Sequence, residues 1–334
     1  MAVLVTGGLG YIGSHFVCEA LIKGKKIVVI DNLSNSEIEI KEKIKRITNK
    51  DFHFYHCDIR DKDKLEHVFK KHNIKVVIHF AGLKSVSESI EMPDEYFDNN
   101  VLGTSCLTEV MNNFNVNKIV FSSSASIYGD SPSSPIKEDA EIKPLSPYAQ
   151  TKLKIEENLL DENIQNKNFK FVILRYFNPV GCHKSYLIGE SPLKPSNLFP
   201  IINEVMAKKR EKLIIYGKNY KTLDGTPIRD YIHISDLIDG HLKALAWLNK
   251  KNNSKLIINL GTGKGYSVLQ IVREFEKILE EPLNFEFSAR RKGDAECCFA
   301  DCNLAKKEIK WHAKKDLTEM CKDSIIWAKL FSSN

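Results

Sequence analysis

The sequence predicts an α/β protein in which a Rossmann-type, doubly wound parallel sheet precedes a smaller C-terminal α/β subdomain. Short apolar runs alternate with segments of helical periodicity between residues 2 and 176, which is typical of a parallel sheet covered by helices. A glycine-rich turn follows the first run directly, and beyond residue 177 the elements become short and rich in proline and glycine. The 334 residues are enough for two subdomains. We therefore predict a Rossmann domain over 1–177 and a second subdomain over 178–334.

The first domain reads as alternating strands and helices. Strands are predicted over 2–6, 26–31, 52–56, 75–80, 118–122 and 169–176. Helices are predicted over 12–21, 61–72, 93–114 and 146–163. The last of these begins with Ser146 and Pro147, which are residue types favoured at the N-cap and at the first helical position.

The second subdomain is predicted from shorter segments. They cover 213–216, 231–232, 235–248, 255–259, 267–279 and 284–287. The helix over 235–248 is a candidate to pack back on the first domain. The run Gly261–Ser267 contains several glycines but lacks the spacing of a phosphate-binding loop, so we interpret it as a turn before the next helix.

Composition excludes several classes of function. The net charge is +6, but the lysines alternate with glutamates instead of forming a basic face, which argues against nucleic-acid binding. The eight cysteines show no repeated ligand spacing, so no metal site is predicted, and reduced thiols in the cytoplasm are expected. We see no signal peptide and no apolar run near the ~18 residues of a membrane span.

The turn after the first strand carries a dinucleotide-binding pattern. Gly7, Gly10 and Gly13 permit a tight turn, close approach of the backbone to a pyrophosphate, and close packing of helix on strand. The following helix offers unpaired N–H groups to the phosphates. Asp31 ends the second strand, where its carboxylate suits ribose hydroxyls and would repel a 2′-phosphate. The predicted cofactor is therefore NAD.

A tyrosine and a lysine are spaced for joint action. Tyr148 and Lys152 lie at i and i+4 and share one helical face. Ser122–Ser124 end the preceding strand, on the side where Rossmann ligands bind. A tyrosine base near neutrality needs its pKa lowered by roughly 3 units from about 10. We expect the ammonium, the helix N-terminus and the nicotinamide cation to lower it.

These motifs resemble a known superfamily. Thr6–Gly13, Asp31–Asn32, Phe80–Leu83, Ser122–Ser124 and Tyr148-x-x-x-Lys152 are similar to the extended short-chain dehydrogenases/reductases. Further segments resemble the UDP-glucose 4-epimerase (UDP-galactose 4-epimerase) family, in order from about residue 2 to 330. They are His79–Lys84, Tyr96–Asn100, Arg175–Gly181, Asp224–Thr226, Arg229–His233, Asn259–Gly261 and Arg290–Asp294.

The resemblance implies a reaction and its catalytic residues. It implies reversible C4 epimerisation of UDP-glucose and UDP-galactose through a transient 4-keto sugar and enzyme-bound NADH. Tyr148 would take the proton of the sugar 4-hydroxyl, and Ser124 would hydrogen-bond the same oxygen. Lys152 would tune Tyr148 and hold the nicotinamide ribose. A homodimer through the helices at about 93–114 and 147–163 is also implied.

The resemblance also implies the binding residues. For NAD these are Gly7, Gly10, Tyr11, Ile12, Gly13, Asp31, Asn32, Asn35, Ser36, Asp58, Ile59, Phe80, Ala81, Gly82, Lys84, Asn99, Ser122, Tyr148, Lys152 and Tyr176. For the UDP-sugar these are Lys84, Ser124, Tyr148, Asn178, Asn197, Leu198, Tyr216, Arg229, Arg291, Asp294 and Cys298. Arginines suit the diphosphate because they donate charge-assisted hydrogen bonds.

One position departs from the pattern of the restricted family members. Cys298 stands where members limited to UDP-glucose and UDP-galactose carry a bulky tyrosine. A thiol leaves room for an N-acetyl group, so UDP-GlcNAc and UDP-GalNAc are predicted as further substrates. The alternative is that neighbouring loops fill this space.

Other functions on the same fold remain as alternatives. A 4,6-dehydratase would carry an Asp-Glu pair after the catalytic serine, whereas Ser124 is followed by Ala125 and Ser126. A UDP-glucuronate epimerase is a second alternative. A non-catalytic NAD-binding sensor is a third, but such proteins usually lose the tyrosine or the lysine.

Overall fold

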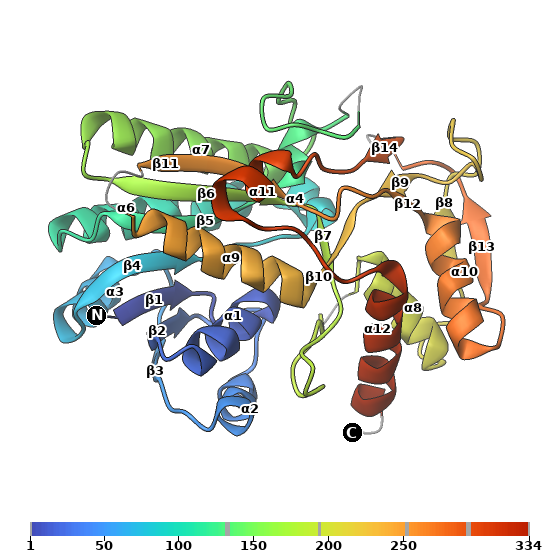
Figure 1. Cartoon of the computed structure of the whole chain (residues 1–334), viewed down its shortest axis with the longest axis horizontal. Coiled ribbons are helices and arrows are strands. Elements are labelled where there is room, and N and C mark those ends of the chain that lie inside the picture. Colours follow the sequence, from blue (N-terminus) through green and yellow to red (C-terminus); the bar gives the residue numbers. More distant parts are fainter. Residues whose placement is uncertain (1, 131–133, 193–194, 251–253, 292–294, 333–334) are drawn as a thin grey trace.

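The computed structural model describes residues 2–130, 134–192, 195–250, 254–291 and 295–332 (Figure 1). Its centre is a seven-stranded sheet in the order β11-β6-β5-β4-β1-β2-β3, and every neighbouring pair is parallel. The strands are β1 (Ala2–Thr6), β2 (Lys26–Asp31), β3 (His53–His56), β4 (Ile74–His79), β5 (Lys118–Ser124), β6 (Lys170–Tyr176) and β11 (Lys255–Leu260). The order reverses between β1 and β4, the place where doubly wound sheets bind ligands.

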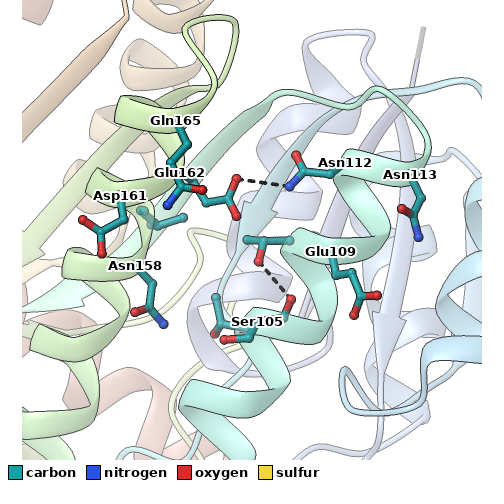
Figure 2. Close-up of a pocket in the computed structure, with 11 residues that line it drawn as sticks. Ser105, Glu109, Asn112, Asn113, Asn158, Asp161, Glu162 and Gln165 are labelled. Atoms are coloured by element: carbon teal, nitrogen blue, oxygen red, sulfur yellow. Dashed lines mark hydrogen bonds between the residues drawn. The ribbon is translucent and has the colours of Figure 1, made fainter.

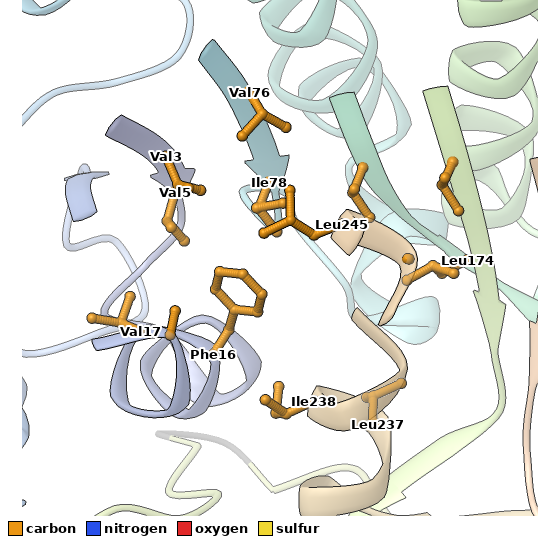
Figure 3. Packing of buried hydrophobic residues seen from close by; sticks show 14 of the residues in the cluster. Val3, Val5, Phe16, Val17, Val76, Ile78, Leu174, Leu237, Ile238 and Leu245 are labelled. Carbon is orange, nitrogen blue, oxygen red and sulfur yellow. The ribbon is translucent and has the colours of Figure 1, made fainter. Parts of the chain in front are cut away.

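Helices cover both faces of this sheet (Figure 1). They are α1 (Tyr11–Ile22), α2 (Glu39–Thr48), α3 (Lys62–Lys71), α4 (Val86–Glu91), α5 (Pro93–Tyr96), α6 (Gly103–Asn113), α7 (Pro147–Gln165), α9 (Ile234–Leu248) and α11 (Asn303–Ile309). One core joins α1 and α9 to the sheet, where Phe16, Leu237 and Ile238 approach Val5 and Ile78 (Figure 3). The opposite core joins α3, α6 and α7 to the other face.

A smaller lobe lies at the side of the sheet (Figure 1). It contains β7 (Asn178–Val180), α8 (Leu198–Met206), β8 (Leu213–Tyr216), β9 (Ile228–Arg229), β10 (Tyr231–His233), β12 (Tyr266–Ser267), α10 (Val268–Leu279), β13 (Phe285–Ser288), β14 (Cys297–Cys298) and α12 (Leu317–Ser332). Its own core gathers side chains from α8, α10, α12 and β8. Ser267 caps α10 with a capping box, so the glycine run before it is the turn that the sequence predicts.

The predicted fold class and the return of the helix at 235–248 are confirmed, since α9 packs against α1, β5 and β6. The assignment of strand 255–259 to the smaller subdomain is wrong, because β11 pairs with β6 in the large sheet. The single helix predicted over 93–114 is interrupted by a π-helical segment at Phe97–Leu102. The sequence analysis missed α2, α4, α8, α11 and α12. The domain division at 177/178 stays a prediction.

Within the described ranges, no helix is both long enough and apolar enough to cross a membrane. In the same part of the chain, no group of three His, Cys, Asp or Glu side chains is placed to hold a metal ion.

Candidate active site

The glycine loop joins β1 to α1 at the switch point of the sheet. Gly7 has φ +64° and its N–H donates to the Ile30 carbonyl at 2.9 Å. A Cβ on Gly7 would lie 2.7 Å from the Ala81 nitrogen, and one on Gly13 would lie 2.1 Å from the Gly7 oxygen. Both glycines are therefore required by the packing of the protein itself.

Gly10 differs from these two glycines. A Cβ there would lie 3.4 Å from the Gly7 oxygen and otherwise meet open space among the described residues. Gly10 is also the N-cap of α1, and within the described ranges no side chain caps this helix. The first N–H groups of α1 are thus available to an anion. An open glycine at an uncapped helix N-terminus fits the pyrophosphate of a dinucleotide.

This difference predicts separate effects for two alanine substitutions. Gly10→Ala should weaken NAD binding by about tenfold or more, a loss of about 1.4 kcal/mol, with little change in stability, because its φ of −68° suits alanine. Gly13→Ala should lower the free energy of unfolding by about 1–3 kcal/mol through overpacking. Isothermal titration calorimetry and urea unfolding measure the two effects. A destabilised Gly10→Ala protein with normal NAD affinity would contradict the assignment.

Asp31 is held rigidly beside the loop. It is buried at 7% exposure, and its Oδ2 accepts from the Leu9 N–H at 3.0 Å. Its Oδ1 accepts from the Leu33 N–H and the Ser36 hydroxyl, both at 2.9 Å. The sequence analysis predicted Asp31 and Ser36 as cofactor residues, and the structure brings them together with the glycine loop.

A second carboxylate lies on the next strand connection. Asn32 donates to Asp58 Oδ2 at 2.9 Å, and Arg60 bonds both Asp58 oxygens. The Arg60 guanidinium holds the pKa of Asp58 well below its usual range. Ile59 is buried beside Asp58, whereas Asn35 is exposed.

The predicted catalytic residues converge at the ends of β5 and α7. Ser146 caps α7 by accepting from the Ala149 N–H, which places Tyr148 in the first turn. The Lys152 Nζ lies one turn further on, 5.9 Å from the centre of the Tyr148 ring. It donates to the Ser122 carbonyl at 2.9 Å. Ser124 lies close enough to Tyr148 to lower the pKa of the tyrosine hydroxyl. The structure therefore brings all three predicted catalytic residues together.

The electrostatics of Tyr148 are dominated by burial. Burial raises the pKa of Tyr148 above its ordinary value, and the hydrogen bond from Ser124 offsets this only in part. Burial also lowers the pKa of Lys152 to about 8, against the raising effect of Glu156. Without the nicotinamide cation, which is one of the three groups expected to lower it, the pKa of Tyr148 stays raised by burial. A phenolate near neutrality would need the additional nicotinamide cation.

The segment after β4 completes this side of the site. Asn100, in the π-helical segment, accepts from the Leu83 N–H at 2.8 Å and donates to the Leu83 carbonyl at 3.0 Å. Asn99 donates to Asn100 Oδ1 at 2.9 Å. A Cβ on Gly82 would lie 3.8 Å from the Lys152 Nζ. The Phe80–Lys84 segment therefore runs directly beside Lys152, the predicted catalytic lysine.

Hydrogen bonds and an ion pair between the two lobes involve further predicted binding residues. The Tyr11 hydroxyl donates to the Gly181 carbonyl at 2.8 Å. Lys84 pairs with Glu190 Oε1 at 3.2 Å, and Asn197 donates to the same oxygen at 3.1 Å. Glu190 thus links the first lobe to the N-cap of α8, where Leu198 follows.

The remaining predicted substrate residues lie in the smaller lobe. Arg229 and Cys298 are paired neighbours on β9 and β14. The Arg291 guanidinium lies 3.9 Å from the centre of the Tyr216 ring. Asn178 is exposed on β7, and its backbone N–H donates to the Asp230 carbonyl oxygen. Asp294 lies outside the described residues.

Several residues of this region were missed by sequence reasoning. They are Asn100, Glu156, Arg175 as a contact residue, Glu190 and His241. Two carried a usable signal: Glu156 follows Lys152 by one helical turn, and His241 is a polar residue on the apolar face of the helix over 235–248. Glu190 carried none, because it lies in a loop whose path only the tertiary structure defines.

A switch-point glycine loop, a buried acidic residue after β2 and a Ser–Tyr–Lys set define a Rossmann-type enzyme with a dinucleotide cofactor. The model of the NAD dependent epimerase/dehydratase family matches residues 3–261, and the chain belongs to this family. Within it, the chain belongs with the UDP-glucose 4-epimerases. The protein of that name from Bacillus subtilis is 48% identical over 98% of this chain and 96% of its own length.

Solved structures agree with this placement. The UDP-glucose-4-epimerase of Stenotrophomonas maltophila, with bound NAD and formylated UDP-arabinopyranose, superposes with a TM-score of 0.97 at 42% identity. That match covers 100% of this chain and 99% of the other. The UDP-Glc/GlcNAc 4-epimerase of Campylobacter jejuni has a TM-score of 0.86 at 35% identity, covering 98% and 99% of the two chains.

Proposed function

We propose that the chain interconverts UDP-glucose and UDP-galactose by inverting C4 of the sugar, with NAD held as a resident cofactor. The observation that carries the proposal is the convergence of Ser124, Tyr148 and Lys152 at the ends of β5 and α7. The open Gly10 and the uncapped α1 support a bound dinucleotide. The family relationship supports the substrate class.

The cofactor would be held by the glycine loop, Asp31, the Phe80–Lys84 segment and Lys152. When bound, NAD would supply hydride acceptance from the sugar C4 and hydride return to the opposite face of the 4-keto sugar. Tyr148 would take the proton from the sugar O4 in one direction and give it back in the other. Ser124 would hydrogen-bond O4 and keep it near the Tyr148 oxygen. Proton transfer by a positioned group of this kind is worth about 10²–10⁴-fold in rate.

The substrate would lie toward the smaller lobe. Arg229 and Arg291 would donate charge-assisted hydrogen bonds to the diphosphate, and the ring of Tyr216 supports Arg291. Asn178, Asn197 and Leu198 would contact the nucleotide sugar from β7 and the start of α8. We assign Asp294 to the uridine ribose from the sequence resemblance alone.

Incubation with UDP-galactose and no added NAD tests this function. Formation of UDP-glucose, followed by NMR, is the expected result, because the cofactor remains bound through each cycle. Absence of product even with NAD supplied would overturn the proposal.

We propose that UDP-GlcNAc and UDP-GalNAc are also substrates. Cys298 is a small residue at the hexose end, next to Arg229 in the strand pairing. It packs on the cluster that contains Ile127 and Phe177, so its thiol has a defined position. The Campylobacter jejuni relative is named for both UDP-Glc and GlcNAc.

Cys298→Tyr should selectively abolish turnover of the N-acetylated sugars. The phenol ring would occupy the space of the N-acetyl group, whereas UDP-glucose needs no such space. We expect a loss of at least about 100-fold in kcat/KM for UDP-GlcNAc and a small change for UDP-glucose. Equal loss for both substrates, or negligible wild-type turnover of UDP-GlcNAc, would contradict this role.

We propose a homodimer through α6 and α7. A groove of about 330 Å³ runs between these helices and is lined by Ser105, Glu109, Asn112, Asn158 and Glu162, among others (Figure 2). Phe97 and Leu102, at the start of the same helical segment, are 46% and 50% exposed. Burial of such side chains favours association. Sedimentation should give twice the mass of the chain, and a monomer would contradict the interface.

We also propose that the enzyme works in a reducing compartment such as the cytoplasm. All eight cysteines lie in the described part of the chain and are free thiols. Free thiols are the usual state of cysteine where glutathione and thioredoxin act.

A further inference from the structure

His241 lies beneath the catalytic residues although it belongs to the C-terminal half of the chain. It is on α9 and is completely buried. Figure 3 shows how α9 lies along the sheet, with Leu237, Ile238 and Leu245 directed into the core. The imidazole centre is 4.9 Å from the Phe80 ring and 5.7 Å from the Tyr176 ring. Both rings belong to the predicted cofactor site.

The hydrogen bonds of His241 define its tautomer. Nδ1 lies 2.9 Å from the Leu237 carbonyl oxygen, which can only accept, so Nδ1 carries the proton. Nε2 then presents a lone pair 3.4 Å from the Ser122 hydroxyl, which must donate to it. Burial lowers the pKa of His241 to about 4, so the ring stays neutral and the acceptor is present at neutral pH.

Ser122 connects His241 to Lys152. Its carbonyl oxygen accepts from the Lys152 Nζ at 2.9 Å. The imidazole that meets the Ser122 hydroxyl also packs against the Tyr176 ring, with 5.7 Å between the two ring centres. One imidazole therefore contacts both Ser122 and Tyr176 beside Lys152.

We propose that His241 is a positioning residue for the cofactor and for the reaction: its neutral Nε2 holds Ser122, and its ring packs on Tyr176, in the geometry that turnover requires. The part that concerns turnover rests on the proposed epimerase function. The part that concerns the cofactor rests on NAD binding alone.

The test compares His241→Leu, His241→Gln and the wild type. Leucine fills the space without an acceptor, whereas the glutamine side-chain amide can place an acceptor near the position of Nε2. For His241→Leu we expect NAD affinity to fall, and kcat to fall by about 10- to 100-fold with KM for UDP-galactose nearly unchanged. His241→Gln should recover most of both losses. Calorimetric NAD titration gives a readout independent of activity.

Leu248→Ala is the matched control. Leu248 is a fully buried residue of the same helix and the same core, so its truncation lowers the melting temperature without removing a contact of Ser122. It should keep kcat and NAD affinity near the wild-type values. Equal losses in His241→Leu and Leu248→Ala, or in His241→Leu and His241→Gln when both fold, would overturn the proposal. Inactive wild-type protein would refute the epimerase function, while the NAD titrations would still decide the role of His241.

Discussion

Tyr148→Phe should reduce kcat by about 100- to 10,000-fold, the range expected for loss of a general acid–base group. The substitution removes the oxygen that would exchange a proton with the sugar O4. It leaves the ring in place over the first turn of α7, so the fold and the NAD site should persist. The measurements are single-turnover kinetics with UDP-galactose and the NAD content of the purified protein.

A tyrosine distant from the site provides the control for this experiment. The Tyr55 hydroxyl on β3 lies 2.8 Å from His72 Nε2, and Tyr55 is not one of the predicted site residues. Tyr55→Phe should keep the wild-type kcat. If Tyr148→Phe retains more than about a tenth of the activity, proton transfer by Tyr148 is not the catalytic step.

Glu156→Gln should impair both stability and the pH range of activity. Arg175 binds Glu156 with three hydrogen bonds, the shortest at 2.6 Å, and both side chains are buried. Ser123 also donates to Glu156. Removing the carboxylate charge leaves a buried guanidinium without its counter-charge, which costs about 3–5 kcal/mol. Urea unfolding measures this loss.

The same substitution should shift the pH profile. The Glu156 charge raises the pKa of Lys152, which burial brings down to about 8. Lysine is charged below its pKa, so the ammonium is lost as the pH rises through about 8. Without Glu156 this loss should begin at lower pH, and the alkaline limb of kcat against pH should move toward neutrality. An unchanged profile would mean that Lys152 charge does not limit turnover.

An exposed ion pair on α7, the helix that carries Glu156, provides the control for a general change in charge. Lys154 and Glu157 lie 3.2 Å apart, and each side chain is 50% exposed. Glu157→Gln should change the free energy of unfolding by no more than about 0.5 kcal/mol. It should leave the pH profile where it is.

Local patterns in the sequence determined much of the first domain. The strands and the glycine loop were predictable because buried parallel strands need continuous apolar runs, and because the tight turn at Gly7 requires a positive φ. Tyr148 and Lys152 were predictable as a pair because the helical repeat puts residues four apart on one face. The N-cap at Ser146 marked where that helix begins.

Contacts between distant segments were decided only by the tertiary structure. Strand 255–259 reads the same in the sequence whether it joins the large sheet or the smaller lobe, and only its pairing with β6 settles the choice. Glu190 reaches Lys84 across 106 positions, and His241 reaches Ser122 across 119. The pKa of Tyr148 depends on burial, which the spacing of residues along the sequence does not reveal. The sequence by itself determined the glycine loop and the predicted catalytic side chains, because their geometry is local. The structure decided what surrounds them, because desolvation and long-range hydrogen bonds depend on chain segments that meet only after folding.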